Sequence, residues 1–126
     1  MPEKKVLVPG PDHPITVEPT KARVVVKAGG RVVADSRNAL TLQEASYPAV
    51  QYIPRADVDF SVLERTHHET YCPYKGDSSY YSLNAGDVQG ENAVWTYEKP
   101  YEAVAPIKDH LAFYPNVVDS IELVED

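Results

Sequence analysis

The sequence of 126 residues is poor in the groups that cross-link small proteins. Its one cysteine, Cys72, cannot form an internal disulfide, and one thiol with four scattered histidines does not supply the four ligands of a structural zinc site. We therefore expect no metal and no cofactor. No apolar run approaches the roughly 20 residues of a membrane span, and residues 1–5 lack the apolar core of a signal peptide. These features predict a soluble, cytoplasmic protein.

Positive charge is also scarce, since 12 Lys+Arg face 19 Asp+Glu and the net charge is −7. An acidic protein repels phosphate backbones and anionic lipid, so we expect neither nucleic acid nor membrane as a partner. The composition is nevertheless 43% hydrophobic, which suffices for the core of one domain of this length. The sequence leaves open whether that domain is a monomer or a dimer.

Long helices are disfavoured because the chain contains 11 prolines. Five of them fall within residues 1–20, which predict an extended, proline-rich N-terminal arm, with residues 15–17 pairing at a sheet edge. Residues 21–126 then form a single domain. One short helix is predicted over residues 57–63, with Asp57 as its N-cap, and a loop or single helical turn near residues 103–107.

The remaining sequence alternates short β-branched segments with turns. Residues 22–27 and 31–36 flank a Gly-Gly turn and predict a hairpin, and residues 40–44 and 50–53 predict a second one. Further strands are expected at residues 69–72, 78–83, 92–97, 111–114 and 120–124. About eight strands joined by short turns predict an all-β fold, a small antiparallel two-sheet sandwich or a partly open barrel.

Chemically versatile side chains are densest in residues 67–81, which hold two histidines, Cys72, Lys75 and four tyrosines. Lys75 could bind an anion or act as a base over a pocket of tyrosines, or it could be a solvated lysine at a turn. Cys72 could be a nucleophile or inert filler. A metal site that uses His67 and His68 is disfavoured, because adjacent residues on a strand point to opposite faces.

Glu44 ends an alternating strand and is the candidate counter-charge of Lys75. A carboxylate there could act as an acid or base, or accept hydrogen bonds from neighbouring tyrosines. We predict Lys75, Glu44 and Cys72 as catalytic residues. The predicted ligand-binding residues are Tyr52, Thr66, Thr70, Tyr80, Trp95 and Tyr97, although Trp95 and Tyr97 also suit a core or a pocket wall.

Asp57 and Asp59 loosely imitate the paired aspartates that hold Mg²⁺ in nucleotidyltransferases. The glycine that approaches the phosphates in those enzymes is absent. Acidic residues are also favoured at the start of a helix, so capping is the preferred interpretation of this pair.

Several segments together resemble the family of domain of unknown function 427 over about residues 22–124. The most specific are Cys-Pro-Tyr-Lys-Gly at residues 72–76 and Tyr-Tyr-Ser at residues 80–82. Matching positions of the family motif are Glu44, Tyr52, Asp57, Thr66, Cys72, Lys75, Tyr80 and Tyr97. The resemblance implies a β-tent, two antiparallel sheets that meet like a ridge. Zinc-binding relatives of that fold carry paired Cys-x-x-Cys motifs, which this chain lacks. The label of the family suggests a second property, the transfer of nucleotides.

These observations predict a small-molecule-binding domain, with or without catalysis. Its metal-free pocket would lie between the two sheets, lined by tyrosines and polarised by Glu44 and Lys75. One alternative is a non-catalytic protein-interaction module that uses its tyrosine-rich face, because Tyr and Trp are enriched at interface hot spots. A nucleotidyltransferase-like enzyme is the third.

Overall fold

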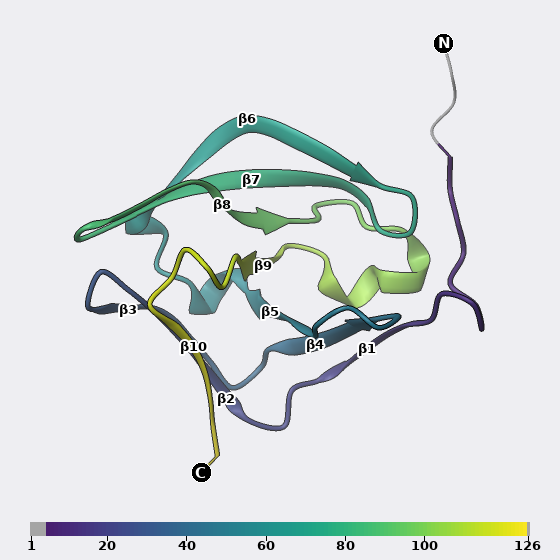
Figure 1. Ribbon diagram of the computed structural model, residues 1–126, viewed down its shortest axis with the longest axis horizontal. Helices are drawn as coiled ribbons and strands as arrows, with labels where there is room; N and C mark the ends of the chain where they lie inside the picture. Colours follow the sequence, from purple (N-terminus) through teal and green to yellow (C-terminus); the bar gives the residue numbers. More distant parts are fainter. Residues whose placement is uncertain (1–4, 126) are drawn as a thin grey trace.

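The computed structural model describes residues 5–125, and these form two antiparallel sheets (Figure 1). The larger sheet has seven strands in the order β1-β4-β5-β9-β8-β7-β6, and the smaller has three in the order β10-β2-β3. The strands are β1 (Ile15–Pro19), β2 (Arg23–Ala28), β3 (Arg31–Ser36), β4 (Leu40–Glu44), β5 (Val50–Pro54), β6 (Leu63–Cys72), β7 (Gly76–Ala85), β8 (Val88–Thr96), β9 (His110–Phe113) and β10 (Ser120–Val124). The predicted all-β, two-sheet architecture is confirmed, and neither sheet closes into a barrel.

Both predicted hairpins are present. Strands β2 and β3 pair across the Gly29-Gly30 turn, where both glycines have positive φ, and β4 pairs with β5. The predicted pairing of the N-terminal arm also occurs, because β1 lies antiparallel to β4 at the edge of the larger sheet. The alternating apolar pattern and the turn residues were sufficient to locate these elements.

The predicted helix at residues 57–63 is wrong in detail. Two one-turn 3-10 helices, η1 (Arg55–Asp57) and η2 (Phe60–Val62), occupy the region. Between them Val58 forms an isolated bridge with Ala34 of β3, and this tertiary pairing holds the chain extended. Asp59, not Asp57, is the N-cap of η2 and accepts a hydrogen bond from the Ser61 backbone N–H. The Asp57 carboxylate instead accepts the Ser36 hydroxyl at 2.6 Å.

The predicted turn near residues 103–107 is the third 3-10 helix, η3 (Glu102–Ile107), which packs against one face of the larger sheet. Within residues 5–125, no helix is long and apolar enough to cross a membrane.

Strand alternation divides the apolar side chains between two cores. The larger core lies between the two sheets and includes Val26, Ile53 and Leu111. The smaller core lies on the opposite face of the larger sheet, where Tyr52 packs with Ile107 of η3. Neighbouring residues such as Tyr52 and Ile53 therefore belong to different cores, and each face of the larger sheet carries its own candidate site.

Candidate functional site

An ion pair joins two distant parts of the larger sheet. Lys75, in the turn between β6 and β7, donates from Nζ to Glu44 Oε1 at 2.7 Å, and Glu44 ends β4 on the other side of the sheet. The sheet therefore curls far enough to bring β4 and the β6–β7 turn together. Both side chains are largely buried, with 13% of Lys75 and 16% of Glu44 exposed. The predicted pairing of Lys75 with Glu44 is confirmed.

His13 completes this group, which we term the polar cluster (His13, Glu44 and Lys75). Its Nε2–H donates to the second oxygen of Glu44 at 2.8 Å, and its ring stacks on Tyr74 with centroids 4.1 Å apart. The arm is also tied to the β6–β7 turn by a backbone hydrogen bond from Leu7 to Pro73 (Figure 1). Sequence analysis missed His13, because nothing in a proline-rich arm indicates which strand end it will meet.

The electrostatics of the polar cluster favour ionised Glu44. Partial burial raises the pKa of this carboxyl, but the hydrogen bonds from Lys75 and His13 outweigh burial and the pKa lies below its ordinary value. Lys75 also lies over the ring of Tyr97, with Nζ 5.8 Å from the centroid. Burial raises the pKa values of Tyr52 and Tyr97 well above that of a free phenol, so both hydroxyls stay protonated near neutral pH.

Most of the predicted ligand-binding residues lie on the same face as the polar cluster. The indole N–H of Trp95 donates to the Tyr52 hydroxyl at 3.1 Å, and the Tyr52 and Tyr97 rings lie 6.5 Å apart. On β6 and β7, the hydroxyls of Thr70 and Tyr80 are hydrogen-bonded at 2.9 Å. On this face Tyr52, Tyr80 and Tyr97 are buried, whereas Trp95 is half-buried and Thr70 is exposed.

The other two predicted site residues are Cys72 and Thr66. The partly buried Cys72 packs against the smaller core. Thr66 lies at the bulge of β6, where its hydroxyl donates to Asn92 Oδ1 at 2.6 Å. Among the hydrogen bonds within residues 5–125, none connects Thr66 to the polar cluster.

A cavity of about 500 Å³ opens between the two sheets, and it is bordered by residues of the larger core and by Val50 and Trp95, which pack against the smaller core. We call it the inter-sheet cavity. Its walls come from β2, β5, β8, β9 and β10 and from the segments after β4 and β9. The lining residues are Val26, Tyr47, Pro48, Ala49, Val50, Gln51, Ile53, Trp95, Phe113, Pro115, Ile121 and Leu123. Of the predicted site residues, Trp95 alone belongs to this set, so the cavity and the polar cluster are two places rather than one pocket.

The rim of the inter-sheet cavity is apolar and exposed, since Tyr47 is 61% and Leu123 is 53% accessible. Sequence analysis missed most of this lining. Isolated aliphatic residues on several strands carry no local signal of a cavity, which arises only where the sheets diverge.

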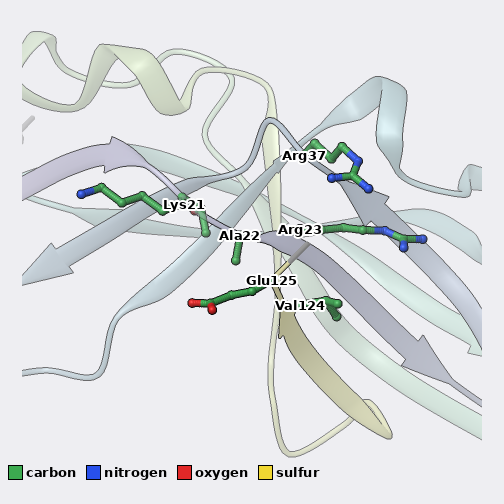
Figure 2. Close-up of a pocket in the computed structure, with 7 residues that line it drawn as sticks. Lys21, Ala22, Arg23, Arg37, Val124 and Glu125 are labelled. Atoms are coloured by element: carbon green, nitrogen blue, oxygen red, sulfur yellow. The ribbon is translucent and has the colours of Figure 1, made fainter.

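A second hollow lies where β2 begins and β10 ends, and three cationic residues border it (Figure 2). Figure 2 shows the Lys21 ammonium on the opposite side from the guanidinium groups of Arg23 and Arg37. Arg23 also makes two hydrogen bonds to the Asp35 carboxylate. The three positive charges do not converge on a common point, as an anion site would require.

The two aspartates considered for Mg²⁺ are engaged elsewhere. Asp57 accepts the Ser36 hydroxyl, whereas Asp59 caps η2 and pairs with Arg31 at 2.6 Å. In the part of the chain that the structure describes, no group of three or more His, Cys, Asp or Glu residues is placed to hold a metal ion.

Comparison with known proteins gives one family. No curated protein matches the chain. The profile described as "Domain of unknown function (DUF427)" matches residues 16–123, which is most of the chain and covers all ten strands except the ends of β1 and β10. The two-sheet fold and the match over nearly the whole length agree with the resemblance at residues 72–76 and 80–82, and the chain belongs to the DUF427 family.

Proposed function

We propose that this domain binds a neutral, largely apolar small molecule in the inter-sheet cavity. The observation that carries the proposal is the cavity itself. Its volume of about 500 Å³ lies in the range of roughly 300–1,000 Å³ that is usual for ligand pockets, and its lining is mainly aliphatic and aromatic. The indole ring of Trp95 in the cavity wall is also held in one orientation by its hydrogen bond to the Tyr52 hydroxyl.

The chemistry of the lining supports a neutral ligand. No acidic or basic side chain is among the lining residues, so a charged group inside would lose its hydration without gaining a counter-charge. An apolar molecule would instead bury its surface against Phe113, Ile121 and Trp95, with the hydrophobic effect as the driving force.

The test uses the sole tryptophan as the reporter. Because Trp95 lines the cavity, titration with isopentylbenzene should change its emission in a saturable manner. Ala49→Phe places a ring at the cavity wall and should weaken binding at least tenfold. Ala103→Phe, at an exposed site on η3 outside the cavity, is the matched control and should bind as the wild type does. Equal binding by both variants, or no binding by the wild type, would refute the proposal.

The polar cluster is a second candidate site. For this site we keep the proposal that Lys75 and Glu44, together with the nearby Cys72, are catalytic residues. It is favoured by one observation, the largely buried Lys75 ammonium beside Glu44 and the Tyr97 ring. An anionic or carbonyl ligand would compete with Glu44 for the ammonium. Titration with 3-phenylpropanoate should then shift the melting temperature of the wild type but not of Lys75→Met, whereas equal shifts would exclude this site.

A protein-interaction module is the candidate function of a different class. The exposed rim residues Tyr47 and Leu123 favour it, because large apolar side chains around a hollow are common in interfaces. A nucleotidyltransferase-like activity ranks third, since Asp57 and Asp59 are each bound by other residues. Magnesium-dependent nucleotide turnover that is lost in Asp57→Asn would revive it.

A further inference from the structure

The side chain of Gln51 is held in one orientation by two threonines. Thr20 Oγ1 donates to Gln51 Oε1 at 2.7 Å, and Thr41 Oγ1 donates to the same oxygen at 3.1 Å. The two threonine hydroxyls also lie 2.8 Å apart, so the single proton of Thr41 is shared between Thr20 Oγ1 and Gln51 Oε1. Thr41 is the direct partner of Gln51 in the β4–β5 register, and Thr20 follows directly after β1, so secondary structure fixes all three residues.

This arrangement leaves the other half of the amide for a ligand. An amide has two N–H donors on its nitrogen, and within residues 5–125 no hydrogen bond from Gln51 Nε2 to another residue is found. Gln51 lines the inter-sheet cavity, where, among the described residues, the only other lining side chains with polar atoms are those of Tyr47 and Trp95. The other lining N–H donor on a side chain, that of Trp95, is already bonded to Tyr52.

We propose that Gln51 is the specificity-determining residue of the inter-sheet cavity, and that the ligand carries a neutral carbonyl oxygen on an apolar body. The inference rests on the proposed function. The carbonyl accepts a hydrogen bond from Gln51 Nε2 while the body packs against Trp95 and Phe113. A carboxylate is disfavoured, because none of the described residues that line the cavity is a lysine, arginine or histidine that could balance its charge.

Three probes of one shape test the inference. 4-Phenyl-2-butanone has a carbonyl oxygen where isopentylbenzene has a methyl group, and 3-phenylpropanoate has a carboxylate there. Each is titrated against the wild type and Gln51→Leu, with Trp95 emission as the readout. Because the two neutral probes differ in hydrophobicity, the decisive quantity is the effect of the variant on each one.

We expect Gln51→Leu to weaken binding of the ketone about fivefold, the usual magnitude for one hydrogen bond, and to leave binding of isopentylbenzene unchanged or tighter. Gln51→Glu retains an oxygen that accepts from Thr20 and Thr41 but removes the N–H donors. It should therefore also weaken binding of the ketone. The propanoate should bind the wild type more weakly than the ketone.

The outcomes separate this inference from the proposed function. If both neutral probes bind the wild type and Gln51→Leu changes them by the same factor, the role of Gln51 is wrong and the binding function stands. Tighter binding of the propanoate than of the ketone also overturns the inference when it persists in Lys75→Met, which removes the ammonium of the polar cluster. If neither neutral probe binds the wild type, the proposed function fails and the inference fails with it.

Discussion

The polar cluster and the inter-sheet cavity share no residue and differ in how their polar groups are satisfied. In the polar cluster, each oxygen of Glu44 has a partner, and Lys75 has its counter-charge within 2.7 Å. In the inter-sheet cavity, the half-buried Gln51 is a lining residue, and its amide nitrogen has no bonded partner among the described residues. Residues that look reactive in the sequence can therefore neutralise one another, while the ligand site that we propose lies among ordinary ones.

The cluster also has a clear structural task. Glu44 links the N-terminal arm, through His13, to the β6–β7 turn, through Lys75, and so joins segments that are remote in the sequence. Within residues 5–125, no side-chain hydrogen bond joins two of the residues that line the cavity. We therefore expect substitutions in the cluster to alter stability more than substitutions at the cavity, and four predictions test this contrast.

The largest effect is expected for Glu44→Ala, which removes the acceptor of both Lys75 and His13. Breaking a buried ion pair costs about 3–5 kcal/mol, and the residual exposure of this pair lowers the expected loss in unfolding free energy to about 2 kcal/mol. Urea denaturation measures it. Glu44→Gln keeps an acceptor and should cost less. A loss no greater than that of Glu102→Ala, at an exposed position, would mean that the cluster does not hold the arm.

Tyr52→Phe should cost about 1 kcal/mol, because the indole N–H of Trp95 then loses its acceptor. Tyr52 is buried in the smaller core, whereas Trp95 also lines the cavity, so this hydrogen bond connects the two regions. The emission maximum of Trp95 should shift along with stability. Tyr47→Phe at the exposed rim is the control, and equal losses for the two variants would contradict a role for the bond.

The stabilisation by Glu44 should depend on pH with a defined sign. The pKa of Glu44 in the folded protein lies below the ordinary value of 4.5, so its contribution is fully present above that pH and is lost as the pH falls through the lowered value. The difference in unfolding free energy between wild type and Glu44→Gln should therefore shrink below about pH 4.5. Comparison of the two proteins cancels the other acidic groups. If this difference in unfolding free energy grows below about pH 4.5, the pKa of Glu44 is not lowered in the folded protein.

The smallest effect is expected for Ala49→Phe, which should change the free energy of unfolding by no more than about 0.5 kcal/mol. Ala49 is exposed at the cavity wall, and surface substitutions away from packed or paired groups are usually this mild. A loss above about 2 kcal/mol in thermal or urea denaturation would show that the cavity wall is tightly packed. The contrast between the two regions would then fail.

The hairpins could be predicted from the sequence because their signals are local. Alternating apolar residues and a Gly-Gly turn specify pairing between neighbouring segments, and the structure has β2–β3 and β4–β5 as expected. The short helix was predicted less well. Asp57 and Asp59 are equally good caps in isolation, and only the bridge between Val58 and Ala34 decides that Asp59 performs this role.

For the candidate sites, the sequence by itself determined the chemistry available and one pairing, that of Lys75 with Glu44. Only the tertiary structure decided that His13 would join them and that Trp95 would line a cavity that this ion pair does not border. It also decided that the Gln51 amide nitrogen would have no bonded partner among residues 5–125, while its oxygen accepts from Thr20. The physical reason is that side-chain type and alternation are set by neighbours along the chain. The curl of a sheet and the gap between two sheets depend instead on contacts between segments tens of residues apart.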